Sequence, residues 1–307
     1  MVGHGFIGRR IARLAHQRGW QVRALSRRAA AGSALPYEQV AGDAADPMVM
    51  SHVLDGVSHV VLAAGTVKPA ESNVHPLEDF RTNLAPLLNT LETMVRRSVP
   101  DLTFLSSAGT VYGPQAGFPT SEDAPMWPIS SYGIQKVAAE RYVSMYAQQF
   151  GFSADILRCS NVYGPGEPHA GSQGLIGVAR TVLRENRSVA LYGDGSARRD
   201  FVHVDDVADV VERLATKPDG VRVLNVGSGE SVAIRDIIDT LATSLGVEPV
   251  IDHRPARPTD VPVVQLDISR IRSLLDFQPR DVRTALLDAG DGEAAGITSH
   301  SDPAVLR

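Results

Sequence analysis

Three glycines near the amino terminus, in the spacing Gly3-x-Gly5-x-x-Gly8, constrain the fold of this chain more than any other feature of its sequence. The spacing is typical of a backbone that leaves a strand, turns tightly beside a phosphate and enters a helix. Apolar side chains then recur at helical spacing from Phe6 to Gln17, and Gly19 suits the carboxyl-terminal cap of that helix. The sequence therefore predicts a phosphate-binding turn at the head of an α/β domain.

Only Met1 and Val2 precede these glycines, at the place where such a turn normally follows a buried strand. The first strand is central in sheets of this kind, so its loss should weaken the site. We expect Met1 to be a late-annotated start or the product of a truncation, and the natural protein to carry several more residues.

Composition describes an ordinary globular chain and excludes several classes of protein. The 307 residues carry a net charge of −5, which provides no basic surface for nucleic acid or anionic membrane. No run approaches the roughly 18 consecutive apolar residues of a membrane span, and the amino terminus lacks the apolar core of a signal peptide. The single cysteine, Cys159, excludes an internal disulfide. We therefore expect a cytoplasmic protein with neither nucleic-acid nor membrane partners.

Strand-like and helix-like patterns alternate through the first half of the chain, which predicts a Rossmann-type doubly wound parallel sheet whose first strand is truncated. The predicted strands are Trp20–Leu25, Tyr37–Ala41, His59–Ala63, Leu102–Leu105 and Ala154–Leu157. The predicted helices between them are Pro47–Leu54, Glu78–Arg97 and Tyr132–Phe150.

The alternation weakens after Gly164, and a smaller α/β lobe is predicted from there on. Its predicted elements are a helix at Leu175–Glu185, strands at Ser188–Tyr192, Val221–Val226 and Pro249–His253, and a helix at Ile234–Leu245. We predict a dinucleotide-binding domain at 1–165 and a substrate lobe at 166–290, with some segments returning to the first domain. Residues 291–307 carry little periodicity and are predicted to be a disordered tail.

Tyr132 and Lys136 carry the strongest chemical signal, because four residues on a helix place two side chains on one face. A phenol has a pKa of about 10 and is a weak base at neutral pH. Lowering it to about 7 needs roughly 4 kcal/mol, which a neighbouring ammonium and an oxidised nicotinamide would supply together. Lysine occurs at only three positions in this arginine-rich chain, so a lysine within a motif is informative.

Several stretches, in a fixed order, resemble the extended short-chain dehydrogenase/reductase family, in particular its nucleotide-sugar epimerases and dehydratases. Besides the glycine turn they are HVVLAAG, FLSSAGTVYG, YGIQK and LRCSNVYGPG, and the resemblance extends from the first residue to about Arg280. It implies an NAD(P)-binding Rossmann domain and a lobe for a nucleotide-diphosphate sugar. It also implies a homodimer in which the helices Glu78–Arg97 and Tyr132–Phe150 pair with their copies.

The resemblance assigns most cofactor contacts to the first domain. It places the pyrophosphate at Gly3, Gly5, Phe6, Ile7 and Gly8, although Val2 stands where the family carries its first glycine. The remaining contacts are Asp43 at the adenine, Ala63, Ala64 and Gly65 beneath the cofactor, Asn83 as a supporting asparagine, and the pair Tyr132 and Lys136 at the nicotinamide ribose.

The choice between NAD and NADP depends on the residues that follow the second predicted strand. NAD enzymes of the family carry an acid there, whereas this chain has Ser26 followed by Arg27 and Arg28. Arginine attracts a 2′-phosphate that a carboxylate would repel, so the sequence leans slightly toward NADP.

The catalytic hydroxyl is less sharply predicted, because Ala108 occupies the position at which the family has serine or threonine. Thr110, two residues further along an extended chain, would point to the same side and is our first candidate. Ser107, next to Ala108, is the second.

The second lobe supplies the substrate contacts that the resemblance implies. Arg199 and Arg257 match arginines that bind the diphosphate, and Asn161 matches an asparagine that reaches the nucleotide. The planar guanidinium binds phosphate oxygens in pairs, which suits arginine to this task.

The sequence thus predicts a nucleotide-sugar C4 epimerase in which Tyr132 takes a proton, hydride passes to the cofactor and a 4-keto sugar forms transiently. Two alternatives stay open: an NADPH-dependent reductase of a nucleotide 4-keto-6-deoxy sugar, and a non-catalytic cofactor sensor. No residue set has metal-ligand spacing, so no metal is expected.

Overall fold

The structure, a computed structural model, describes residues 1–27, 35–65, 72–115, 117–167, 174–217, 219–256 and 261–288. Arg28, Arg257 and the predicted tail at 291–307 lie outside these ranges. Among the described residues, no helix combines the length and the apolar character needed to cross a membrane.

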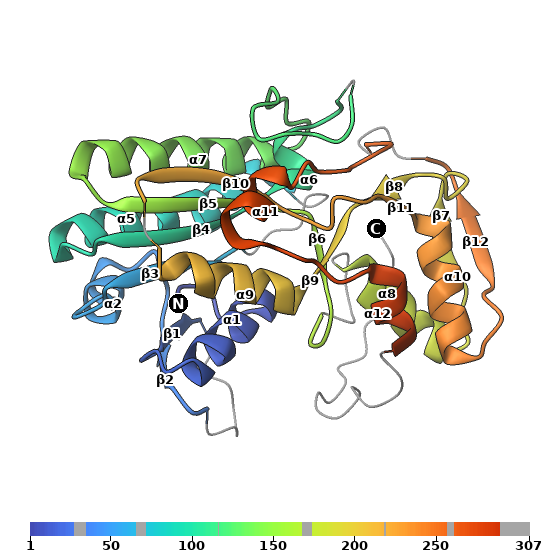
Figure 1. Ribbon diagram of the computed structural model, residues 1–307, viewed down its shortest axis with the longest axis horizontal. Helices are drawn as coiled ribbons and strands as arrows, with labels where there is room; N and C mark the ends of the chain where they lie inside the picture. The colour runs from blue at the N-terminus through green and yellow to red at the C-terminus, as the bar shows by residue number, and fades with distance from the viewer. Residues whose placement is uncertain are drawn as a thin grey trace.

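The main sheet is parallel throughout (Figure 1). Val2 joins its two parts. Its strands are β1 (Arg23–Ser26), β2 (Glu38–Ala41), β3 (His59–Leu62), β4 (Asp101–Ser107), β5 (Ser153–Cys159) and β10 (Val221–Val226). β1 pairs with β2, and the others pair in the order β10-β5-β4-β3. Val2 bridges β1 and β3, so the full order is β2-β1-Val2-β3-β4-β5-β10. This order confirms the predicted Rossmann-type fold class.

Met1 and Val2 make the backbone hydrogen bonds of a very short central strand. The Val2 N–H donates to the Val61 carbonyl at 2.9 Å, and the Ala63 N–H donates to the Val2 carbonyl at 2.8 Å. On the other side, the Leu25 N–H donates to the Met1 carbonyl at 2.8 Å. The residues before the glycine turn therefore connect β1 with β3 and place the turn at the carboxyl ends of both.

Helices cover both faces of the main sheet (Figure 1). One face packs against α2 (Pro47–Val53), α5 (Ala85–Arg97) and α7 (Ser131–Phe150), and the other against α1 (Phe6–Gln17), α9 (Val204–Ala215) and α11 (Ser269–Leu275). Successive side chains of a strand point to opposite faces, so Phe104 joins the first core and Leu105 the second.

The predicted helix at 78–97 is interrupted. The structure has α4 (Pro76–Asp79), then the π-helical turn η1 (Phe80–Leu84), and then α5. Pro86 lies in the first turn of α5 and carries no N–H, so the regular i→i−4 ladder cannot pass through this point.

Thr110 does not follow Ala108 along an extended chain, as the sequence had indicated. β4 ends at Ser107, and Ala108–Val111 form the short helix α6. Side chains two residues apart on a helix do not share a face, so alternation cannot place Thr110.

A smaller lobe lies beside the carboxyl ends of the main sheet and has its own core (Figure 1). Its strand pairs are β6 (Asn161–Tyr163) with β9 (Phe201–His203), β7 (Val189–Tyr192) with β12 (Ile251–Arg254), and β8 (Arg198–Arg199) with β11 (Val232–Ala233). Its helices are α8 (Leu175–Arg184), α10 (Ile234–Leu245) and α12 (Val282–Asp288). The strand at 221–226, predicted within this lobe, instead pairs with β5 as β10, because its apolar side chains complete both cores of the main sheet.

Candidate active site

Two positions of the amino-terminal turn require glycine. Gly3 has a φ of 96°, and a Cβ there would overlap the backbone of Ala64. A Cβ on Gly8 would overlap the carbonyl of Gly3. A Cβ on Gly5 would meet nothing within 4 Å, so this residue leaves the approach to α1 open. No side chain caps the first turn of α1, whose N–H groups face that approach.

A cavity of about 750 Å³ lies beside this turn, at the carboxyl ends of β1, β2 and β3. Most residues predicted to bind the cofactor line it, namely Gly3, Gly5, Ser26, Arg27, Asp43, Ala63, Ala64 and Gly65. The cavity volume, the glycine cradle and the uncapped helix terminus all fit the pyrophosphate and adenosine of a dinucleotide.

Six other predicted cofactor residues do not line this cavity, namely Phe6, Ile7, Gly8, Asn83, Tyr132 and Lys136. The Ile7 side chain packs against the second core of the sheet. Phe6 is the first residue of α1, and its ring lies near Gly166. Asn83 lines a separate cavity of about 20 Å³ together with Tyr132 and Lys136.

His4 is a cavity-lining residue that sequence reasoning missed. It is buried, its Nε2 pairs with the Tyr37 hydroxyl at 2.9 Å, and its Nδ1 pairs with the Gln39 amide at 3.1 Å. Burial lowers the pKa of His4 to about 4, so the ring is neutral at physiological pH. The variable position inside the glycine motif carried no signal for this role. Arg9, Arg81 and Thr82 also line the cavity.

Tyr132 and Lys136 lie together at the start of α7, as predicted. The Ser130 side chain caps this helix by accepting from the Gly133 N–H at 3.1 Å. The Lys136 ammonium donates to the Leu105 carbonyl at 2.8 Å and lies 5.6 Å from the centre of the Tyr132 ring. The pair therefore faces the carboxyl end of β4.

Burial dominates the electrostatics of Tyr132 among the chain's own residues, and the lowered pKa that the sequence predicted needs the nicotinamide as well. Burial raises its pKa to about 12, and the charges of Asp79 and Cys159 act in the same direction. The Ser107 hydroxyl acts in the opposite direction. Burial also lowers the pKa of Lys136 to about 8. The chain's own residues thus keep the phenol protonated, because desolvation outweighs the neighbouring ammonium.

The two candidate hydroxyls have different partners. The Ser107 hydroxyl acts on the Tyr132 phenol and lowers its pKa. The Thr110 hydroxyl donates to the main-chain carbonyl of Ser107 at 3.2 Å. Only the first is engaged directly with the phenol.

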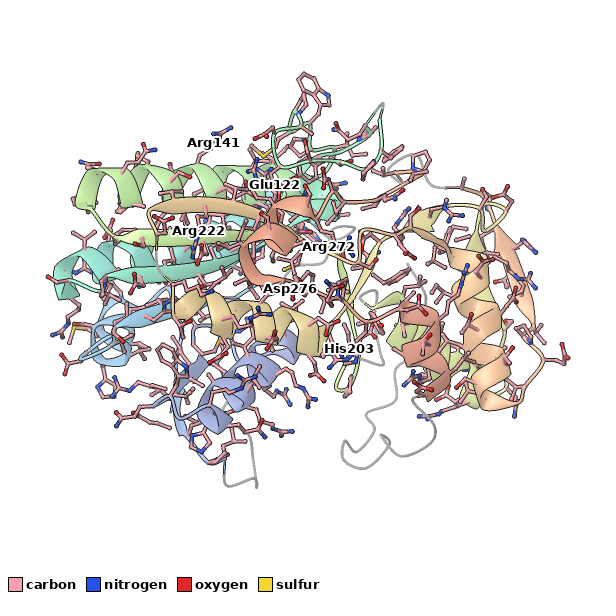
Figure 2. The ribbon with its side chains drawn as sticks, in the orientation of Figure 1. Glu122, Arg141, His203, Arg222, Arg272 and Asp276 are labelled. Atoms are coloured by element: carbon pink, nitrogen blue, oxygen red, sulfur yellow. The ribbon has the colours of Figure 1, made fainter. Side chains whose placement is uncertain are left out.

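A buried ion pair fixes α7 against the sheet one turn beyond Lys136. Arg158 on β5 contacts both carboxylate oxygens of Glu140, the shorter distance being 2.8 Å, and both side chains are at most 5% exposed. Ser106 donates to Glu140 at 2.5 Å. Arg158 also donates to the carbonyl of Glu122, which lies beside α11 in Figure 2. Removing either charge would leave the other buried and unpaired.

The two predicted substrate residues that the structure describes, Asn161 and Arg199, lie on β6 and β8. The Asn161 side chain is in reach of Gly109 on α6, since a Cβ on that glycine would lie 3.7 Å from its Oδ1. The Arg199 guanidinium donates to the Val261 carbonyl at 2.7 Å. In the part of the chain that the structure describes, no group of His, Cys, Asp or Glu side chains could hold a metal.

Residues 1–227 match the NAD dependent epimerase/dehydratase family, and the chain therefore belongs to this family of enzymes. It is 33% identical over 205 residues to a UDP-glucose 4-epimerase of Mycolicibacterium smegmatis, an alignment that covers 67% of this chain and 66% of that protein, just under two thirds of it.

Two solved structures extend the likeness to almost the whole chain. A UDP-glucose 4-epimerase of Thermotoga maritima with UDP-glucose has 28% identity and a TM-score of 0.87, covering 93% of this chain and 95% of that one. A UDP-glucose 4-epimerase of Thermus thermophilus in complex with NAD has 29% identity and a TM-score of 0.86, covering 93% and 96%. Family and fold are as the sequence predicted.

Proposed function

We propose that this protein is a nucleotide-sugar epimerase that inverts C4 through a transient 4-keto sugar, with UDP-glucose and UDP-galactose as its substrate pair. The observation that carries the proposal is the grouping of Tyr132, Lys136 and Ser107 at the carboxyl end of β4, next to the dinucleotide cavity. The relatives described above are named UDP-glucose 4-epimerases, which supports the substrate class.

Tyr132 is the residue we assign to the proton of the C4 hydroxyl. The Ser107 hydroxyl acts on its phenol and lowers the pKa of that group, so we place both near the sugar oxygen. This favours Ser107 over Thr110 as the second hydroxyl. Lys136, held by the Leu105 carbonyl, keeps a positive charge beside the phenol ring. When bound, the nicotinamide cofactor accepts the hydride from C4 and returns it.

We propose NAD as the cofactor, in line with the Thermus thermophilus relative that was solved with NAD. Gly3, Gly8 and the first turn of α1 would hold its pyrophosphate. The lean toward NADP from Ser26 and Arg27 stays a prediction, since both residues line the cavity. Calorimetric titration of the protein with NAD and with NADP distinguishes the two.

Arg199, Asn161 and Arg257 remain our proposed contacts to the nucleotide diphosphate. Asn161 lies beside the α6 turn, which places it between the catalytic hydroxyls and the smaller lobe. Arg199 to Ala tests this assignment, because losing a phosphate contact should raise the KM for the nucleotide sugar more than it lowers kcat.

We also propose that the protein is a homodimer in the cytoplasm. The outer face of α7 exposes large apolar side chains, namely Ile134, Tyr142, Met145 and Phe150, and Phe80 of η1 is exposed as well. Several large exposed apolar side chains on one helix favour association between copies. Light scattering during gel filtration should give twice the chain mass.

Proton NMR of UDP-, dTDP- and GDP-hexoses, incubated with the protein and a trace of NAD, tests the proposed activity. Conversion of one sugar into its C4 epimer without net change in the cofactor is the expected result. Net oxidation of NADPH with a 4-keto-6-deoxy sugar would instead establish the reductase. Cofactor binding without turnover of any sugar would favour the sensor.

A further inference from the structure

The first turn of the catalytic helix is held by a segment that lies about sixty residues earlier in the chain. The Ser131 N–H donates to the Asn73 side chain at 2.8 Å, and the Tyr132 N–H donates to the Ser72 hydroxyl at 3.1 Å. A helix leaves its first N–H groups without internal partners, so these contacts complete the amino terminus of α7. Tyr132 is thus positioned partly by residues outside its own helix.

Asp79, at the end of α4, makes the side-chain contacts between the same two segments. Its carboxylate is fully buried and accepts from the Ser131 hydroxyl at 3.2 Å and from the Gln135 amide. It also accepts from the Asn83 amide at 2.6 Å. Ser131 and Gln135 are four residues apart and lie on the same face of α7, so Asp79 holds the helical turn that carries Tyr132.

The three donors to Asp79 are neutral. Among the described residues, no Lys, Arg or His lies within ion-pair distance of its carboxylate, although the more distant Lys136 acts on its charge. A buried carboxylate held only by neutral donors is costly, and burial raises the pKa of Asp79 accordingly. Such a group is retained at a cost in stability, which suggests a role beyond packing.

The π-helical turn η1 connects Asp79 with the cofactor cavity. Arg81, Thr82 and Pro86 line that cavity, whereas Asn83 turns back toward Asp79. Asn83 also lies near Gly65 at the edge of the cavity, since a Cβ on this glycine would be 3.7 Å from the Asn83 Oδ1. One short segment therefore contacts both the cofactor cavity and the catalytic turn. π-helical turns are frequent at functional sites.

We propose that Asp79 is a positioning residue for catalysis, whose carboxylate ties the first turn of α7 to the cofactor-lining segment and so fixes the place of Tyr132. This proposal rests on the function proposed above. It assigns to Asp79 no contact with substrate or cofactor.

A consequence for pH dependence follows from the groups that face the phenol. These are Asp79 from α4, Ser107 from β4, Cys159 from β5 and Lys136 from α7 itself. The charge of Asp79 is one of the causes that raise the pKa of Tyr132. Removing it should make the phenol easier to ionise.

Three variants distinguish the effect of the Asp79 charge from the effect of its side-chain contacts with α7. Asp79→Asn keeps the shape of the side chain and removes its charge, whereas Asp79→Ala removes both. Glu78→Gln, an exposed acid on the same helix, is the matched control. For each variant we would measure kcat and KM across pH, and hydrogen exchange of the peptide 128–138 without cofactor.

For Asp79→Asn we expect the acid limb of the kcat profile to move to lower pH by about half a unit to one unit. For Asp79→Ala we expect kcat to fall about tenfold at an unchanged KM, and exchange at the start of α7 to quicken about tenfold. Glu78→Gln should match the parent in every measurement.

A profile for Asp79→Asn that superimposes on that of the parent, together with parental exchange at 128–138 in this variant, would overturn the proposal. Should Asp79→Ala fail to fold, Asp79→Asn still decides between these outcomes. A parent without epimerase activity would refute the proposed function alone, because the exchange measurement needs no substrate.

Discussion

The cavity beside Gly3 is formed mainly by backbone and small side chains, whereas the turn that carries Tyr132 is held by buried polar and charged groups. At the first, φ angles and close backbone contacts dictate glycine at positions 3 and 8. At the second, Asp79 and the pair of Arg158 with Glu140 are buried, and the partly buried Lys136 donates to the Leu105 carbonyl. The difference teaches that a binding surface made of backbone and small side chains needs few buried polar groups. Reactive groups, in contrast, must be held in place although their desolvation is unfavourable.

The largest expected effect is at the catalytic turn. Tyr132→Phe should lower kcat about a thousandfold, because it removes the only group we assign to the C4 proton. Binding of the nucleotide sugar should stay within about twofold, since the ring is retained. Steady-state kinetics and calorimetry measure both quantities. Tyr142→Phe on the exposed face of α7 is the control, and turnover at the parental rate in Tyr132→Phe would refute the assignment.

Substitution of Gly3 in the amino-terminal turn should first lower the stability of the protein. Gly3→Ala places a Cβ against the Ala64 backbone at a positive φ and should cost about 3 kcal/mol in the free energy of unfolding. Urea denaturation without cofactor measures this cost. Gly117→Ala, where a Cβ meets nothing within 4 Å, should be neutral. Equal stabilities of the two variants would mean that the cradle is not held by backbone geometry.

At the catalytic turn, removing the charge of Lys136 should instead raise the free energy of unfolding. Lys136→Met should abolish turnover yet raise the free energy of unfolding by about 1–2 kcal/mol at pH 7, because it deletes a desolvated ammonium. The exposed Lys217→Met should do neither.

The pH dependence of this gain follows from the two pKa values of Lys136. Burial lowers the pKa to about 8, against 10.5 for an ordinary lysine. Between these values the unfolded chain still binds the proton and the folded one does not, so the parent gains stability as pH rises. The advantage of Lys136→Met should therefore be complete below pH 8 and shrink toward pH 10.5. Denaturation at several pH values checks this, and a constant difference would contradict it.

The smallest effect distinguishes the two hydroxyls. Ser107→Ala should lower kcat about fivefold, because it removes a hydroxyl that lowers the pKa of the Tyr132 phenol. Thr110→Val should change kcat less than about twofold, since that hydroxyl bonds a main-chain carbonyl. The reverse order in the same kinetic assay would restore Thr110 as the first candidate.

Local patterns predicted a large share of this molecule. The bounds of α1, β10 and α10 agree with the periodicity, because each has an unbroken apolar stripe ended by a clear signal such as Gly246. The grouping of Gly3, Asp43 and Ala64 around one cavity agrees with the cofactor contacts that the family resemblance implied.

What the sequence could not predict depends on contacts between distant segments. Nothing near Ser72 or Asn73 indicates that they cap a helix that begins at Ser131. The pairing of β10 with β5 depends on the course of the whole chain, and the direction of the pKa shift at Tyr132 depends on how completely the fold removes water. Hydrophobic periodicity predicts one helix or strand at a time and does not predict which distant segments contact each other.

The π-helical turn between α4 and α5 also fixes an angle. A regular helix turns by about 100° per residue, so the extra residue accommodated at Phe80–Leu84 rotates everything before it relative to α5. Deleting one residue there would leave the composition of the segment almost unchanged and swing the Asp79 carboxylate away from Ser131 and Gln135. The direction in which the buried Asp79 side chain points is thus set by the number of residues in this turn rather than by their identity.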